Sequence, residues 1–212
     1  MYCLCLLTNL NNNDMNDMND MNEIHFKSTK PGSKVYDYLD HTWVLNEQLD
    51  LYEVLKLPEF QKFEHCATIV YSNNTAGFDI KLEPNFVNQN FVIYMITTRG
   101  KILKGGKSKN SLDTRSYGAG TEESWTERGT PSVTNYAWSQ IFRQCLSDGY
   151  EVRFYGMVCP TIEMTYPSFD GEIITEKISP YESEEKKLNG LLNKLNGKKV
   201  IGEGKLLAPF KS

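Results

Sequence analysis

The chain has 212 residues, which suits one domain of ordinary size or one such domain with an appendage. Hydrophobic residues make up 40% and aromatic residues 12%, enough to build a core, and the net charge is −4. Residues 1–90 hold 6 basic and 13 acidic side chains, whereas residues 91–212 hold 17 and 14. Because nucleic-acid binders are usually basic overall, this composition excludes binding through total charge and restricts a nucleic-acid site to a local patch in the second half.

The five cysteines are odd in number and none stands in a CxxC pair, so we expect free thiols in a reducing cytoplasm rather than a metal site or a disulfide framework. The apolar opening, MYCLCLL, is too short to span a membrane and no basic residue precedes it. The sequence therefore predicts a cytoplasmic protein with no membrane partner.

Residues 1–22 contain a three-residue Asn-Asp-Met repeat with little to bury, which predicts a disordered leader. Residues 41–60 then predict a helix that ends at Pro58. Residues 66–84 predict two strands around a turn that contains Gly77. Together these segments form an N-terminal helix and hairpin extension over residues 23–88, ahead of a main domain over residues 89–212.

The main domain begins with two strands, FVIYMIT and KILKGG, joined by a tight turn at Arg99-Gly100. A short helix carrying Arg115 follows, then a glycine-containing loop. A helix over residues 132–149 opens with Ser132 as its cap and closes at Gly149. A third strand at residues 151–158 and a final helix at residues 181–197 complete the order β-β-α-α-β-α. This order predicts an α+β fold with a small antiparallel sheet flanked by helices.

Residues 92–107, VIYMITTRGKILKGGK, resemble the signature of the GIY-YIG nuclease superfamily. Val92-Ile93-Tyr94 occupies the place of Gly-Ile-Tyr, and Lys104-Gly105-Gly106 occupies the place of Tyr-Ile-Gly. The following GGKSKNSLDTR, and the later SVTNYAWSQIFRQCLSDGYEVRFYG, resemble further family segments. The resemblance covers about residues 90–200 but not 1–85, and it is closest to restriction-type and phage-encoded members. The sequence departs from the signature at Lys104, which stands in place of the second tyrosine. Some restriction-type members also carry lysine at this position.

The resemblance implies an endonuclease that hydrolyses phosphodiester bonds of double-stranded DNA with Mg²⁺ or Mn²⁺, in a bacterium or a phage-infected host cell. A single site of this type cuts one strand at a time, so a homodimer would let two sites act on a duplex. The alternative is a weakened or non-catalytic nucleic-acid-binding module that keeps the fold, which the lost tyrosine and the acidic total charge favour. A third possibility is an interaction protein that works through residues 1–85.

Two neighbouring strands of a hairpin carry Tyr94 and Lys104, so these side chains can approach each other across the ladder. A nearby cation favours phenolate, which makes Tyr94 a plausible general base, although a core tyrosine is the other interpretation. The planar fork of Arg115 suits the phosphate oxygens, although any single arginine can equally be a solvated surface residue.

A divalent metal ion needs a carboxylate, and the final helix offers Glu182, Glu184 and Glu185. Glu185 falls on the apolar stripe of that helix, where a carboxylate is costly without a partner or a metal. We therefore predict Glu185 as the metal ligand, with Glu182 as the second choice. The alternative interpretation is that the whole acidic run is a solvated face of the helix. The residues of the stripe are Tyr181, Leu188, Leu192 and Leu195.

Several further residues are candidates for contacts with DNA. The glycines permit close approach of the backbone to DNA, or else mark only a strand end or bulge. The lysines contact flanking phosphates or are solvated. The polar residues at the start of the central helix bind a phosphate or simply cap the helix. These candidates are Gly105, Gly106, Lys107, Lys109, Ser132 and Asn135.

Overall fold

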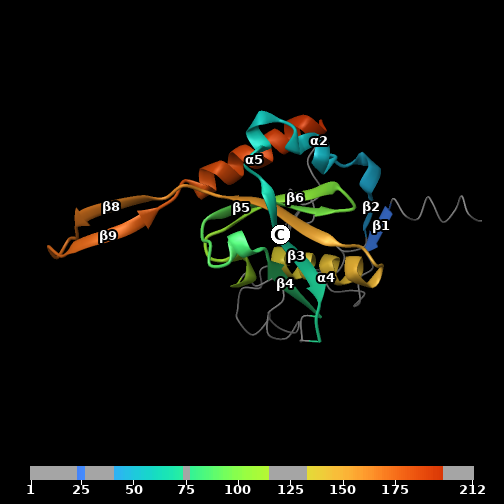
Figure 1. The fold of residues 1–212 in the computed structure, drawn as a ribbon, viewed down its shortest axis with the longest axis horizontal. Coiled ribbons are helices and arrows are strands. Elements are labelled where there is room, and N and C mark those ends of the chain that lie inside the picture. Colours follow the sequence, from blue (N-terminus) through green and yellow to red (C-terminus); the bar gives the residue numbers. More distant parts are fainter. Residues whose placement is uncertain (1–22, 27–40, 74–76, 115–132, 198–212) are drawn as a thin grey trace, which may run out of the picture.

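The computed structural model describes residues 23–26, 41–73, 77–114 and 133–197 (Figure 1). Its centre is a five-stranded sheet in the order β4-β3-β7-β5-β6, and every neighbouring pair is antiparallel. Helices cover both faces, so the predicted α+β class is confirmed. The strands are β3 (Glu64–Tyr71), β4 (Phe78–Leu82), β5 (Val92–Thr98), β6 (Lys101–Ser108) and β7 (Val152–Val158).

The hairpin of β5 and β6 forms as predicted. Arg99 and Gly100 both have left-handed backbone angles, with φ of 50° and 73°. A two-residue turn of this kind matches the twist of the strands that it joins. All seven residues of β5 are buried, because this strand is covered on both faces.

Two hydrophobic cores lie on opposite faces of the sheet. On one face, α4 (Val133–Ser147) packs Trp138 and Phe142 against alternate residues of β5. On the other face, α5 (Tyr181–Asn196) and α2 (Leu51–Leu55) pack against the intervening residues of β5. Both long helices were predicted, and Gly149 and Gly197 follow them with φ of 75° and 66°.

The apolar stripe predicted for the final helix is shorter than expected. Leu188 and Leu192 are buried, with 3% and 0% of their surface exposed. Leu195 is 43% exposed, so the stripe ends at Leu192.

The helix predicted over residues 41–58 is wrong in extent. His41–Val44 is strand β2, which pairs with β1 (Glu23–Phe26), and a 3-10 helix η1 (Leu45–Glu47) follows. The α-helix begins only at Leu51, because the Asp50 carboxylate accepts hydrogen bonds from the backbone N–H groups of Tyr52 and Glu53. It ends at Leu55, before Pro58 opens a second 3-10 helix, η2 (Pro58–Phe60).

The hairpin predicted over residues 66–84 is confirmed as β3 and β4, but it is not a separate appendage. β3 pairs with β7, where Ala67 lies opposite Phe154 and Ile69 opposite Val152. The sheet therefore crosses the boundary at residue 88 between the predicted extension and the predicted main domain. A 3-10 helix, η3 (Pro84–Phe86), leads from β4 towards β5.

The predicted order of elements in the main domain missed one hairpin. Strands β8 (Ile162–Pro167) and β9 (Ile173–Ile178) form a two-stranded sheet that projects away from the body (Figure 1). After β6, the structure has a 3-10 helix, η4 (Leu112–Thr114), at the start of the predicted short helix. The leader 1–22, Arg115, the loop before α4 and Ser132 lie outside the described residues.

Cys66, Cys145 and Cys159 are buried free thiols, as predicted. Burial raises the pKa of the Cys145 thiol to about 12, so it stays protonated. No helix in the described part of the chain is both long and apolar enough to cross a membrane.

Candidate active site on the β5–β6 hairpin

Tyr94 lies directly opposite Gly106 in the ladder between β5 and β6. The Tyr94 side chain is fully buried, and its ring lies 5.2 Å from that of Phe154. A Cβ atom on Gly106 would come within 2.8 Å of Cε2, Cζ and Oη of Tyr94. The tyrosine of one half of the motif therefore requires the glycine of the other half.

Lys104 shares a face of the hairpin with Tyr94. It pairs with Ile96, one same-face position further along β5 than Tyr94. Its ammonium group lies 5.2 Å from the ring centroid of Trp138 on α4, a cation–π distance. Tyr94 and Lys104 are therefore diagonal neighbours on the face that α4 covers.

The opposite face of the same hairpin holds a second charged group. The Lys107 ammonium lies 3.0 Å from Oε2 of Glu185 and 3.4 Å from Oε1 of Glu182. It also lies 5.7 Å from the ring centroid of Tyr181, on the first turn of α5. The Glu185 side chain is 22% exposed, whereas that of Glu182 is 63% exposed. Glu185 is thus the more enclosed of the two carboxylates.

The protonation of Lys107 follows from these contacts. Partial burial lowers the pKa of this lysine, but hydrogen bonds and attraction from Glu185 and then Glu182 outweigh burial, so the pKa lies above its ordinary value. Lys107 is therefore positively charged at neutral pH and neutralises part of the acidic run on α5.

Gly105 explains why α5 lies so close to β6. A Cβ atom on Gly105 would collide with the amide of Asn189 and would lie 3.4 Å from Cδ2 of Leu188. Asn189 is four residues after Glu185, so the two side chains share one face of α5. Both motif glycines are buried, one beneath each face of the hairpin, which gives each of them a packing role.

The side chains on α5 include oxygen donors of the kind that Mg²⁺ takes. Mg²⁺ in proteins is typically held by one or two carboxylates together with water and substrate phosphate. Glu185 and Glu182 supply the carboxylates, and the buried Oδ1 of Asn189 has no hydrogen-bond partner. The described residues contain no group of three or more His, Cys, Asp or Glu side chains with metal-binding geometry, so a metal here would need oxygens from water or phosphate.

The predicted site residues thus fall into two groups on opposite faces of β5 and β6. Tyr94 lies with Lys104, and Lys107 lies with Glu185 and Glu182. The two faces meet at the edge of β6, which is the last strand of the sheet among the described residues.

The remaining candidates are less informative. Lys109 is exposed after β6, and its carbonyl oxygen accepts a hydrogen bond from the Phe91 N–H at 3.0 Å. Asn135 belongs to α4, but its side chain is not described. Arg115 and Ser132 lie outside the described residues.

Sequence reasoning missed two features of this site, the role of Lys107 as the partner of the α5 carboxylates and the packing of Asn189 over Gly105. The spacing of Glu185 and Asn189 on the stripe of α5 was a usable signal for the second. The first depends on how α5 is placed against β6, which no local pattern reports.

No protein-family profile and no curated protein sequence matches the chain. Among solved structures, the chain is similar to restriction endonuclease HPY188I in complex with product DNA, with 25% identity, coverage of 75% of this chain and 88% of that chain, and a TM-score of 0.48. It is also similar to a mutant of bacteriophage T4 EndoII, with 23% identity, coverage of 68% and 96%, and a TM-score of 0.46. At TM-scores below 0.5, the chemistry of the site has to be interpreted from its own residues.

Proposed function

We propose that the chain is a GIY-YIG-type endonuclease that hydrolyses phosphodiester bonds of double-stranded DNA with Mg²⁺ or Mn²⁺. The observation that carries this proposal is the β5–β6 hairpin. It sets the two halves of the motif against each other, with Tyr94 packed on Gly106 and Lys104 on the same face.

In this mechanism Tyr94 is the general base. As phenolate it takes a proton from a water molecule, whose oxygen attacks phosphorus while the bond to the 3′ oxygen breaks. The Lys104 ammonium favours the phenolate form of its diagonal neighbour and neutralises charge on the phosphate. Arg115 holds the non-bridging phosphate oxygens with its planar fork.

Glu185 is the proposed metal ligand, with Glu182 as the second choice. A bound Mg²⁺ supplies positive charge to the phosphate and to the departing 3′ oxygen. Lys107 pairs with both carboxylates in the free protein, and it can pair with a phosphate when DNA binds. We place the scissile phosphate at the edge of β6, where the two faces of the hairpin that carry these side chains meet.

The complete burial of Tyr94 adds a requirement to this mechanism. Water and phosphate must reach the phenol, so the proposal includes opening of the α4-covered face when DNA binds. The same burial, and the separation of Tyr94 from Glu185 by the sheet, favour the alternative that the chain binds nucleic acid without cutting it.

Incubation of the full chain with supercoiled plasmid tests the proposal, with Mg²⁺, Mn²⁺ or EDTA present. We expect nicked and linear DNA with either metal and none with EDTA. Glu185→Gln should reduce cleavage roughly 100-fold or more while DNA binding persists. Glu184→Gln is the matched control, because Glu184 pairs with Lys187 at 2.7 Å instead of with β6.

The other outcomes are equally distinct. Loss of cleavage in Glu182→Gln but not in Glu185→Gln would show that the metal ligand is Glu182, one helical turn before Glu185. Cleavage that survives EDTA and both substitutions would contradict the metal site. A wild-type chain that retards DNA but never cuts it would identify the binding module.

A further inference from the structure

The projecting hairpin of β8 and β9 has one apolar face and one mainly polar face. On the mainly polar face, Glu163 and Lys177 form an ion pair at 3.5 Å, and the hydroxyls of Thr165 and Thr175 are 2.9 Å apart. The third pair of this face, Pro167–Ile173, is apolar, and Ile173 is 70% exposed. The other face is apolar at five of its six positions, through the cross-strand pairs Ile162–Ile178, Met164–Glu176 and Tyr166–Ile174.

The apolar face of this hairpin is exposed. Ile162 is 68% exposed, Met164 45% and Ile178 43%. An isolated two-stranded hairpin is at best marginally stable in water, and a strand pair with alternating polarity is typical of a sheet with one covered face. The pattern therefore indicates that another molecule covers this face.

The tip of the hairpin is a structured turn. The Ser168 N–H donates to the Glu172 carbonyl oxygen at 2.7 Å, and the Gly171 N–H donates to the Ser168 carbonyl oxygen at 3.0 Å. Phe169 is held in this turn with its side chain fully exposed, and Asp170 and Glu172 lie on either side of Gly171. A large apolar ring close to two carboxylates suits a pocket that is lined by aromatic and basic side chains.

The charge of the hairpin argues against DNA as the occupant. Residues 162–178 hold four carboxylates and one lysine. Such a segment repels phosphate, since binding to nucleic acid depends on positive charge. A protein surface with arginine and aromatic side chains is the better match.

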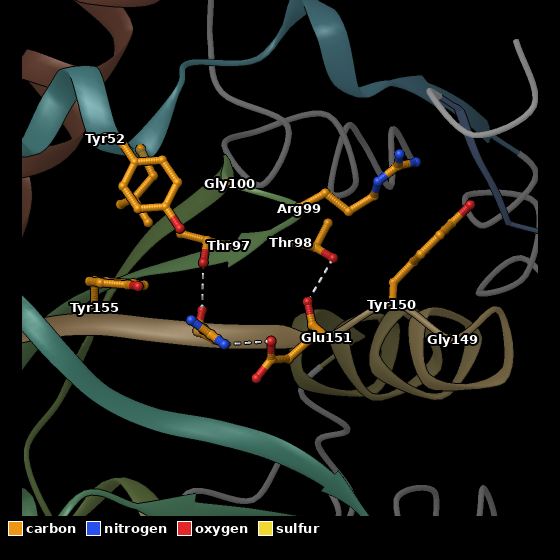
Figure 2. Close-up of a pocket in the computed structure, with 11 residues that line it drawn as sticks. Tyr52, Thr97, Thr98, Arg99, Gly100, Gly149, Tyr150, Glu151 and Tyr155 are labelled. Atoms are coloured by element: carbon orange, nitrogen blue, oxygen red, sulfur yellow. Dashed lines mark hydrogen bonds and ion pairs between the residues drawn. The ribbon is translucent and has the colours of Figure 1, made fainter. Parts of the chain in front are cut away.

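The chain itself carries such a surface. A pocket of about 590 Å³ lies where the β5–β6 turn, α2 and the start of β7 meet (Figure 2). Its lining includes Tyr52, Tyr150 and Tyr155 together with two arginines. The Arg99 guanidinium lies 5.2 Å from the ring centroid of Tyr150, and Arg153 pairs with Glu151 at 2.7 Å.

We propose that the β8–β9 hairpin of one copy docks on a second copy of this chain and places its tip in this pocket. Phe169 then packs among the tyrosine rings, and Asp170 and Glu172 approach Arg99 and Arg153. In Figure 1 the hairpin extends along the long axis of the molecule, away from α2, so a copy does not reach its own pocket. Reciprocal docking of two hairpins closes a symmetric pair. This pairing stands apart from the nuclease proposal, since it concerns assembly alone.

The test is the association of the full chain, measured by sedimentation velocity and light scattering over a dilution series. We expect a dimer whose dissociation constant rises at least about tenfold in Phe169→Ala and in the double variant Asp170→Lys, Glu172→Lys. Tyr71→Ala is the matched control, because Tyr71 is 76% exposed on β3 and does not line the pocket. Circular dichroism melting confirms that each variant is folded.

A mixing experiment identifies the pocket. Arg99→Glu should also dissociate the dimer. When this variant is mixed with the Asp170→Lys, Glu172→Lys chain, each mixed pair regains a contact between opposite charges, so association should partly return. A monomeric wild type, or a dimer that none of these changes weakens, overturns the proposal. So does a hairpin variant that loses DNA binding but keeps the wild-type dissociation constant.

Discussion

Gly105 and Gly106 are adjacent in the sequence but face opposite sides of β6, as successive residues of a strand do. Beneath Gly106 lies the ring of Tyr94, and against Gly105 lies the amide of Asn189. Each missing side chain makes room for a close contact on its own face. This pair of glycines therefore sets both the position of the motif tyrosine and the distance between α5 and the sheet.

Gly106→Ala should destabilise the protein by about 1–3 kcal/mol, because the new methyl carbon would lie 2.8 Å from three atoms of the Tyr94 side chain, closer than van der Waals contact. Gly190→Ala is the control, since nothing lies within 4 Å of its Cβ position on α5. It should be neutral or stabilise by up to about 1 kcal/mol, as alanine favours helix. Urea unfolding measures both changes, and equal stability of the two variants would contradict the packing of Tyr94 on Gly106.

Lys104→Ala should slow plasmid cleavage by roughly 100-fold while leaving DNA affinity near that of the wild type. Lys109 is exposed and lies beyond the strand, so Lys109→Ala should mainly weaken binding and reduce the slope of log affinity against log salt by about 1. Lys104→Tyr, which places at this position the tyrosine of the GIY-YIG signature that the sequence resembles, should keep part of the activity. If Lys104→Ala cleaves at the wild-type rate, Lys104 has no role in cleavage and contributes only its cation–π contact with Trp138.

At the scale of elements, α2 is a five-residue helix that depends on its ends. Asp50 caps its first turn, and the Leu51 N–H donates to the Gly100 carbonyl oxygen at 2.8 Å. The Asp50 carboxylate also lies 3.4 Å from the Lys101 ammonium. One side chain thus ties α2 to the β5–β6 turn.

Asp50→Ala should lower the free energy of unfolding by about 1 kcal/mol at pH 7, the usual effect of losing an N-cap. Burial alone raises the pKa of Asp50, but bonds from the backbone N–H of Glu53, from Lys101 and from Tyr52 outweigh it, and the pKa lies below its ordinary value. The stabilisation is therefore present above the pKa of a free aspartate and is lost as pH falls through the lowered value.

Thermal melting between pH 7 and pH 2 checks the Asp50 prediction. The difference between wild type and Asp50→Ala should shrink as the solution becomes more acidic than the ordinary aspartate pKa of 3.8. Asp50→Asn is the control, because asparagine caps helices well and does not titrate. A difference between wild type and Asp50→Ala that stays constant with pH would show that the charge of Asp50 contributes nothing.

On the scale of the whole molecule, the two halves of the sequence share one sheet. β3 lies between β4 and β7, and its buried residues Cys66, Ala67 and Ile69 belong to the core that also holds Tyr94. Leu51 and Phe60 belong to the core on the other face. Residues before 86 therefore complete both cores.

A chain that starts at residue 86 should be insoluble or unfolded, because it exposes the edge of β7 and both cores. A chain that starts at residue 23 should fold and keep the activity of the full chain, since the leader was predicted to have little to bury. Circular dichroism, sizing with light scattering and the plasmid assay compare the two. A soluble, fully active fragment 86–212 would contradict the structural role of β3 and α2.

The sequence by itself determined the features that depend on neighbouring residues. The Arg99-Gly100 turn, the glycine-terminated helices α4 and α5, and the strands on either side of Gly77 were predicted because backbone preference and apolar periodicity act within a few residues. Glu185 was likewise placed on the apolar stripe of its helix from its spacing alone. Its enclosure beside Lys107, with 22% of the side chain exposed, matches that spacing.

Tertiary structure alone decided which segments meet. β3 pairs with β7, and Lys107 contacts Glu185, although the partners are more than 50 positions apart in the sequence. The sheet also separates Tyr94 from Glu185, which likewise lie more than 50 positions apart along the chain. Local preferences do not report such contacts, because they arise from the burial of whole faces of helices and sheets against one another.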